Sequence, residues 1–129
     1  MPTRDNFTLT NNTRAKLPHV PFASIKDAGL GLNYSLSLVF IGEKESQKLN
    51  FSYRGKNKPT NILSFPLDKK SGEIFITLSV ARKEALMFDR TFSNFIAFLF
   101  IHGLMHLKGH LHGDTMERAE SKLRRKFAV

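Results

Sequence analysis

A long apolar segment between Thr91 and Lys108 constrains the fold of this chain more than any other segment. Its apolar side chains fall on nearly every face of a helix, whereas a surface helix carries them on one stripe. Other elements must therefore cover it from several sides, so we expect a helix in the middle of a domain, capped by Thr91 or Ser93. The apolar residues are Phe95, Ile96, Phe98, Leu99, Phe100, Ile101, Leu104 and Met105.

Three histidines lie at the end of this segment, in the pattern H-x3-H-x2-G-x2-H. His102 and His106 are four residues apart, so they share one face of the helix. Gly109 favours the end of the helix, because glycine adopts the left-handed conformation that follows many helices. The chain then turns back, and His112 can return to the same point. Three imidazoles with a fourth position left open are typical of a catalytic zinc site.

The sequence leaves open which histidine is the third ligand and which metal ion binds. His110 lies four residues after His106 and would share its face if the helix continued, but Gly109 argues against that continuation, so we favour His112. Three imidazoles also accept nickel, copper or cobalt. The pattern therefore predicts one Zn²⁺ per chain, or another divalent transition metal ion.

The same spacing occurs in metzincin proteases, where the residue after the first histidine is a glutamate. In those enzymes the glutamate takes a proton from the metal-bound water. This chain has Gly103 at that position. Peptide hydrolysis by the usual route is therefore disfavoured, and a zinc peptidase is only a second alternative.

Composition fits one soluble domain over residues 1–129, since 41% of the 129 residues are hydrophobic. The net charge of +9 favours polyanionic partners, of which nucleic acid is the commonest in a cytoplasm. The chain has no cysteine, which agrees with a reducing, cytoplasmic location. The polar segment 1–16 lacks the apolar centre of a signal peptide, and the apolar run 95–101 is too short to span a bilayer.

Hydrophobic periodicity predicts the remaining elements. We expect strands at residues 7–9, 34–41, 60–65 and 72–77, and helices at 22–28, 43–53, 79–88 and from Asp114 onward. Gly29 is expected to end the first of these helices, and the last two strands to form a hairpin across a polar loop. In the second helix we expect Phe51 and Tyr53 to be buried rather than free to stack on a base. The last helix has an apolar stripe of Met116, Ala119, Leu123 and Phe127.

A second motif lies before the histidines, from Leu49 to Pro66: LNFSYRGKNKPTNILSFP. This segment resembles the YbeY family, which has the block LNxxYRGKxxPTxVLSFP, then a Gly-Asp-Ile strand, then HGxLHLxGYDH. Here Gly72-Glu73-Ile74 and the histidine run stand in the second and third places. The resemblance covers about residues 34–129, and two separate motifs in the same order make it specific.

The resemblance implies an α+β fold, with a small mixed sheet packed against helices and a central buried helix that carries the H-x3-H-x5-H site. It implies a metal-dependent endoribonuclease specific for single-stranded RNA. Such enzymes act in ribosomal RNA maturation, including the 3′ end of the small-subunit RNA, and in ribosome quality control. The implied partners are single-stranded RNA, ribosomal RNA and the ribosome or its small subunit. The family histidines match His102, His106 and His112, and the family arginine matches Arg54.

Two departures from the family pattern concern the surroundings of the metal. His110 and Leu111 stand where the family has tyrosine and aspartate, and Glu73 stands where the strand has aspartate. The missing aspartate could orient a ligand histidine through a hydrogen bond. Asp114 is a candidate to replace it.

The expected chemistry is phosphodiester cleavage. A guanidinium binds a phosphate through two parallel hydrogen bonds, and Arg54 is the candidate for that role. Lys56 and Lys58 are expected to hold the RNA backbone. Either water or the neighbouring 2′-hydroxyl could be the nucleophile. The first alternative function is a non-catalytic, ribosome-associated RNA-binding factor with a structural metal, since positive charge supports it equally well.

Overall fold

The computed structural model describes residues 6–109 and 114–129 and has the expected α+β fold. The strands are β1 (Phe7–Asn11), β2 (Ser35–Ile41), β3 (Ile62–Asp68) and β4 (Ser71–Thr77). The helices are α1 (Phe22–Leu30), α2 (Glu43–Arg54), α3 (Leu78–Met87), α4 (Phe92–Leu107) and α5 (Asp114–Lys126).

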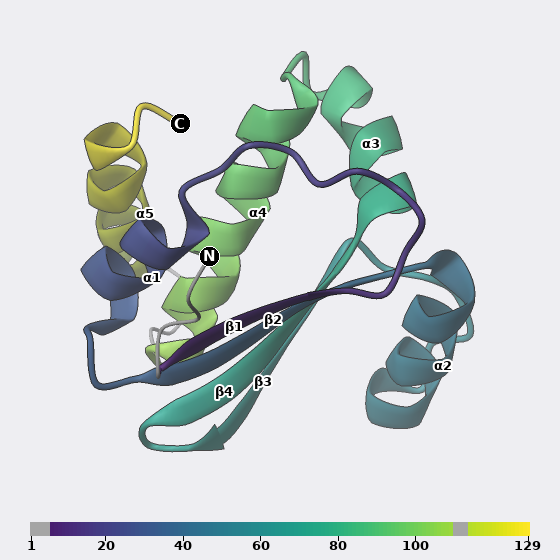
Figure 1. The fold of residues 1–129 in the computed structure, drawn as a ribbon, viewed down its shortest axis with the longest axis horizontal. Coiled ribbons are helices and arrows are strands. Elements are labelled where there is room, and N and C mark those ends of the chain that lie inside the picture. The colour runs from purple at the N-terminus through teal and green to yellow at the C-terminus, as the bar shows by residue number, and fades with distance from the viewer. Residues whose placement is uncertain (1–5, 110–113) are drawn as a thin grey trace.

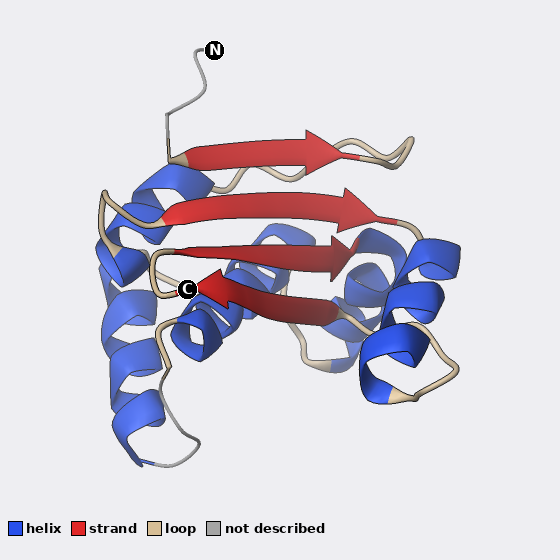
Figure 2. Cartoon of the chain, turned by 90° about the horizontal axis from the view of Figure 1, so that it is seen from below, coloured by secondary structure: helices blue, strands red, loops and turns tan. Residues whose placement is uncertain are grey.

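The four strands form one mixed sheet in the order β1-β2-β4-β3. β2 pairs parallel with both β1 and β4, and β3 pairs antiparallel with β4 as the expected hairpin. The parallel pairs need crossover connections, which α1 supplies between β1 and β2. Figure 1 shows α4 and α1 on one side of the sheet, and Figure 2 shows the other side facing the viewer, with α2 at one end.

Helix α4 is the centre of the molecule, as its all-round apolar character predicts. It contacts α1, α3 and α5 as well as β3 and β4. The side chains of Ile96, Phe100 and Leu104 are fully buried. Thr91 caps the helix, because its hydroxyl accepts a hydrogen bond from the amide of Asn94 at 3.1 Å. Among the described residues, no helix has both the length and the apolar character that a membrane crossing requires.

The first helix ends two residues later than expected. Gly29 lies inside α1, and Gly31 follows the helix with a φ of +92°. A Cβ atom at Gly29 would lie 3.1 Å from both a Leu104 and a Leu123 methyl group. This glycine therefore permits the close approach of α1 to α4 and α5, and its position inside a helix reflects packing rather than termination.

The strand β3 is longer than expected. It continues through Pro66, which is opposite Gly72, and ends at Asp68. Proline donates no hydrogen bond, but β3 is an edge strand, where the missing donor leaves no gap between two strands. The polar loop thereby shortens to Lys69 and Lys70, and the Asp68 carboxylate accepts a hydrogen bond from the Lys70 amide at 2.8 Å.

Polar side chains attach α2 to the loop that follows it. Ser46 exchanges two hydrogen bonds with the backbone of Thr60, at 2.9 and 3.0 Å. Asn50 donates to the Lys58 carbonyl at 2.8 Å. Phe51 and Tyr53 remain 58% and 66% exposed, so the expectation that they are buried is wrong. The helix is attached to its own following loop, and that attachment does not need the aromatic residues.

Candidate metal centre

Helix α4 brings His102 and His106 together, one turn apart on the same face. Their Nε2 atoms are 2.9 Å apart, and their rings are nearly perpendicular, at 83°. His102 is partly buried and His106 is exposed. Helix α4 therefore brings the two predicted ligands side by side.

The spacing of these nitrogens fits a shared metal ion. Zinc binds imidazole nitrogen at ~2.0–2.1 Å, so two such ligands of one ion lie at most about 4.2 Å apart. The 2.9 Å separation of the Nε2 atoms lies within that limit. Both side chains project from one rigid, buried helix, which holds the pair in a fixed geometry.

Glu120, from α5, is the partner of His102 on the opposite side of the ring. Its Oε1 atom makes a short hydrogen bond with His102 Nδ1, and the Glu120 side chain is only 13% exposed. A carboxylate there accepts the Nδ1 hydrogen and leaves Nε2 as the unprotonated nitrogen, which is the form that can bind a metal ion. The carboxylate–histidine arrangement is the usual support of a metal ligand.

Glu120 was not predicted as a site residue, although its place beside the apolar stripe of α5 could have indicated it. The buried Met116 and Leu123 confirm the expected apolar stripe of α5. Glu120 lies beside this stripe, next to Ala119 and three residues before Leu123. A carboxylate at the border of a stripe that packs on the histidine-bearing helix is a candidate for contact with a histidine.

The third ligand lies outside the described residues. His112 belongs to the segment 110–113, as do His110 and Leu111, and the side chain of Asp114 is likewise not described. Across residues 6–109 and 114–129, no third histidine, cysteine, aspartate or glutamate completes a metal-binding group with the pair. Three-histidine coordination therefore stays a prediction.

The end of α4 agrees with the role expected of Gly109. The helix ends at Leu107, and Gly109 has a φ of +87°, in the left-handed region that favours glycine. Its amide donates to the His106 carbonyl at 3.1 Å. His110 was an alternative ligand only if the helix continued past Gly109, and it does not.

Gly103 lies against the sheet, not at the metal centre. A Cβ atom there would lie 2.9 Å from Ile62 Cδ1, 3.0 Å from Ser64 Oγ and 3.1 Å from Ile74 Cδ1. The residue that a metzincin uses as its general base would thus point into a packed interior. This geometry gives the zinc peptidase alternative a physical objection beyond the missing carboxylate.

The predicted RNA-binding residues are exposed but lie elsewhere. Arg54 is in the last turn of α2, which Gly55 ends with a φ of +69°, and Lys56 and Lys58 follow in the loop. Among the described residues, the Arg54 side chain has no hydrogen-bond or ion-pair partner. Figures 1 and 2 place α2 and the last turn of α4 toward opposite ends of the sheet. The structure does not bring Arg54 to the histidines, and its role stays a prediction.

Comparison with known proteins extends the family resemblance to nearly the whole chain. The profile of the family described as endoribonuclease YbeY matches residues 4–127. The chain is 38% identical to endoribonuclease YbeY of Buchnera aphidicola over 100 residues, which span 68% of this chain and 64% of that protein. It is 39% identical to the Alteromonas mediterranea protein of that name, over 76% of this chain and 66% of the relative.

A third relative is matched over more of its length. Endoribonuclease YbeY of Alkaliphilus metalliredigens is 32% identical over 82% of this chain and 76% of that protein. For the first two relatives the match spans just under two thirds of their own length.

The fold is shared with a solved structure. The solution structure of a Thermotoga maritima protein superposes with a TM-score of 0.67 over 94% of this chain and 88% of that chain, at 22% identity. The profile match and the identities together establish the relationship: the chain belongs to the endoribonuclease YbeY family.

Proposed function

We propose that this chain is a metal-dependent endoribonuclease that cleaves single-stranded RNA. Its proposed role is the maturation of ribosomal RNA in the cytoplasm, including the 3′ end of the small-subunit RNA. Membership of the endoribonuclease YbeY family supports the reaction class. The observation that carries the proposal is the pair of imidazole nitrogens 2.9 Å apart, with a carboxylate fixing one of the two rings.

The proposed ligands are His102, His106 and His112, and the proposed ion is zinc or another divalent transition metal. When bound, such an ion acts as a Lewis acid and lowers the pKa of water. The residues present fit this ion, because imidazole nitrogen is a preferred ligand of zinc and the two described Nε2 atoms are close enough to share one ion.

The protein residues have separate tasks. Glu120 holds the His102 ring with Nε2 free, so that the ligand does not have to be reoriented when the ion binds. Gly103 keeps the helix against the sheet and contributes no carboxylate. The proposed nucleophile is water or the adjacent 2′-hydroxyl of the RNA.

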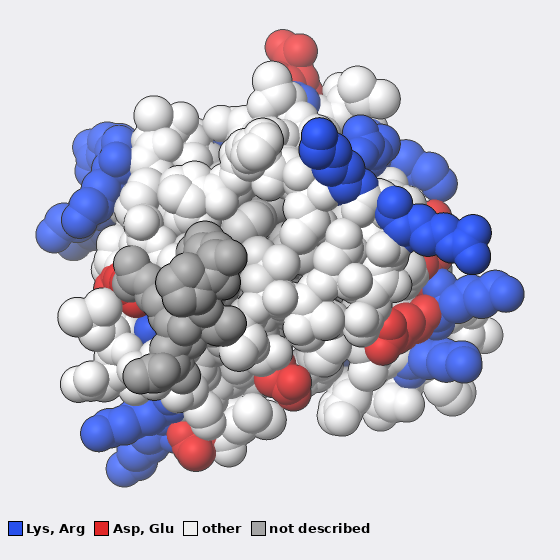
Figure 3. Space-filling model, viewed as in Figure 1, with Lys and Arg blue, Asp and Glu red and all other residues white. Residues whose placement is uncertain are grey.

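The proposed substrate contacts use positive charge. The net charge is +9, and Figure 3 shows lysine and arginine side chains in separate groups, over α5 on the left and over the α2 and α3 side on the right. Arg54 ends α2 and Lys56 and Lys58 follow it in the loop, and these three residues are proposed to bind the RNA backbone. Ribosomal RNA and the small ribosomal subunit are the proposed partners, and ribosome quality control is a proposed process.

The test compares RNA cleavage with metal content. His106→Ala should lose both bound metal and cleavage of a single-stranded RNA, whereas the wild-type chain cleaves it and leaves duplex RNA intact. His19→Ala is the matched control, since His19 is an exposed histidine remote in sequence. Full cleavage by a metal-free His106→Ala protein would contradict the proposal.

The same assay decides on the alternative of a non-catalytic RNA-binding factor, which the positive charge also supports. A wild-type chain that binds single-stranded RNA and holds its metal, yet leaves the RNA uncut, would favour that alternative. Addition of a chelator then separates a structural metal, whose removal unfolds the chain, from a catalytic one.

A further inference from the structure

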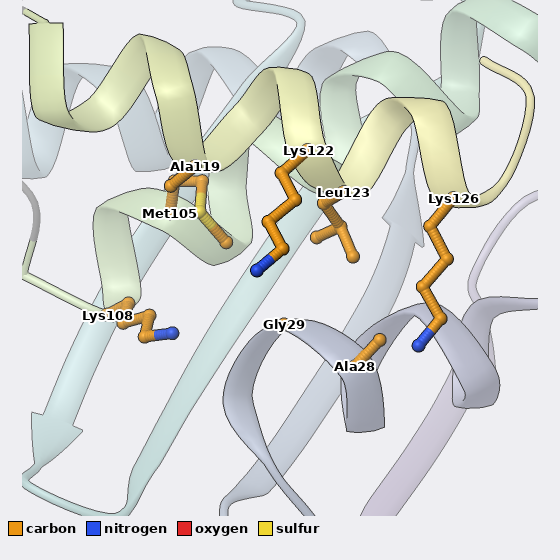
Figure 4. A pocket seen from close by; sticks show the side chains of 8 residues that line it. All are labelled: Ala28, Gly29, Met105, Lys108, Ala119, Lys122, Leu123 and Lys126. Carbon is orange, nitrogen blue, oxygen red and sulfur yellow. The ribbon is translucent and has the colours of Figure 1, made fainter.

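Three lysines surround a hollow between α1 and α5 that the metal centre does not use. The hollow has a volume of about 310 Å³. Figure 4 shows the side chains of Lys122 and Lys126 descending from α5 toward α1, with Lys108 at the side, at the end of α4. The floor is apolar or small and includes Gly29, Met105 and Leu123.

The three lysine side chains are exposed. None of Lys108, Lys122 and Lys126 makes a hydrogen bond or ion pair with a residue that the structure describes. Lys122 and Lys126 are four residues apart on one helix, and like charges at this spacing repel. Such an arrangement becomes favourable when an anion lies between the ammonium groups.

The floor explains why the hollow persists. Met105 is 2% exposed and Leu123 6% exposed, so neither can move into the space without leaving the core. A Cβ atom at Gly29 would lie 3.1 Å from a Leu123 methyl group, so α1 packs closely against α5 at this glycine. The packing of three helices thus sets the shape of the hollow, and flexible lysines form only its rim.

The hollow and the candidate metal centre use the same two helices, α4 and α5, but lie on different faces of them. Met105 lies between His102 and His106 in sequence, and Lys108 follows His106 by two residues. At 1.5 Å and about 100° per residue, Lys108 lies about 9 Å along the helix axis from His102 and about 120° around it. On α5, Glu120 at His102 and Lys122 at the hollow are two residues apart, so they point to different sides of that helix.

We infer that this hollow is a phosphate-binding subsite for the RNA strand, one that holds a backbone phosphate away from the scissile bond. The inference rests on the proposed function. Three point charges without a planar guanidinium suit a phosphate group, which lysine binds without fixed geometry. The contact positions the strand on the metal centre and reads no base.

The test is the salt dependence of RNA binding by a Lys122→Ala/Lys126→Ala variant. The matched control is Arg118→Ala/Arg125→Ala, which removes the same two charges from the same helix but from residues that line a separate hollow. Binding of a fluorescein-labelled 12-nucleotide single-stranded RNA is followed by anisotropy, in chelator, over a potassium chloride series. Each lost contact to single-stranded RNA lowers the slope of log Kd against log salt by about 0.7.

The expected result is a slope lowered by about 1.4 in the lysine variant and by less than half of that in the arginine variant. An equal or greater fall in the arginine variant would overturn the inference, and so would an unchanged slope in the lysine variant. Melting temperatures should match the wild type, since the substituted side chains are exposed and unpartnered. A fall in slope that accompanies loss of the folded state does not count as support.

Two further comparisons distinguish an acidic protein ligand, and a failure of the proposed function, from the inferred phosphate subsite. A 12-residue polyglutamate should not displace the RNA at equal concentration, and displacement would assign the hollow to acidic protein instead. Failure of the proposed function is distinct, because it appears as wild-type chain that binds RNA without cutting it. In that case the slope comparison still decides whether the lysines bind the RNA backbone.

Discussion

Removal of the Glu120 carboxylate should weaken metal binding while leaving the fold intact. Oxygen Oε1 holds His102 Nδ1, so the ligating Nε2 is oriented before an ion arrives. Loss of such a partner costs about 10–100-fold in metal affinity. The His102 side chain is 35% exposed, so water replaces part of the lost hydrogen bond. We therefore expect the lower part of that range for Glu120→Ala, ~10–30-fold, or about 1.4–2 kcal/mol.

The Glu120→Gln substitution refines the prediction. An amide oxygen still accepts the Nδ1 hydrogen, but a neutral acceptor retains only about half the strength of a charged one. We expect a loss of ~3–5-fold in metal affinity, about half of the free-energy change of the alanine variant.

The assay is a zinc titration against a competing chromophoric chelator. Glu117→Ala is the matched control, since Glu117 is an exposed carboxylate on the same helix, three residues away. In a His102→Ala background the change at Glu120 should have no further effect, because its partner is gone. The reasoning is refuted if Glu120→Ala binds zinc within twofold of the wild type, or if the Glu117 variant loses as much.

Three further predictions concern stability. Burial, and secondarily the charge of Asp68, raises the pKa of Tyr34. The stability that this shift contributes is complete below the unfolded pKa of about 10 and is lost as pH rises above it. In Tyr34→Phe, the free energy of unfolding measured in urea should therefore depend less on pH above about 10 than in the wild type. The Tyr34 hydroxyl is also buried and has no hydrogen-bond partner among the residues that the structure describes. At pH 7 Tyr34→Phe should therefore be as stable as the wild type or up to about 1 kcal/mol more stable, and a loss of stability would contradict this. Gly103→Ala should lower the melting temperature, because the added methyl group would overpack against Ile62 and Ile74 at a cost of about 1–3 kcal/mol. This cost exceeds the gain of about 1 kcal/mol that alanine brings over glycine inside a helix. A raised melting temperature would contradict the close packing of Gly103 on the sheet. Hydrogen bonds from the Lys70 amide and from Ser71 lower the pKa of Asp68. The stability that this shift contributes is present above the unfolded pKa of about 3.9 and is lost as pH falls below it. Asp68→Asn should remove this loss in an acid-unfolding titration, and an unchanged titration would refute the prediction.

The sequence was most informative where one face of an element decides its environment. The all-round apolar character of α4 predicted its central place, and the alternation in β2 and the stripe of α5 predicted which residues are buried. These patterns follow from burial alone, which acts on each element separately. The close approach of His102 and His106 followed for the same reason, since both lie on one helix.

Contacts between elements were less predictable. The burial of Gly29 reflects the approach of α1 to Leu104 and Leu123, which are more than seventy residues away in the chain. Pro66 ended a predicted strand, but it lies on the sheet edge, and strand order is not visible in the sequence of one strand. Glu120 reaches His102 only because α5 folds back along α4, a tertiary contact.

The α2 helix departed from prediction for a different reason. Its aromatic residues suggested burial, yet the helix buries Ser46 and Asn50 and leaves Phe51 and Tyr53 exposed. Hydrogen bonds from buried polar side chains attach this helix to the following loop, where most helices bury apolar side chains. Periodicity counts apolar residues, so it does not detect a helix that is held by polar side chains.

Counting the ligands of a bound ion tests the central claim most directly. X-ray absorption at the zinc edge should find three imidazole nitrogens at ~2.0–2.1 Å in the zinc-loaded wild type. In His112→Ala we expect either no bound zinc or a zinc held by two imidazole nitrogens. A shell of three imidazoles that survives this substitution, or a wild-type shell without imidazole nitrogen, would contradict it.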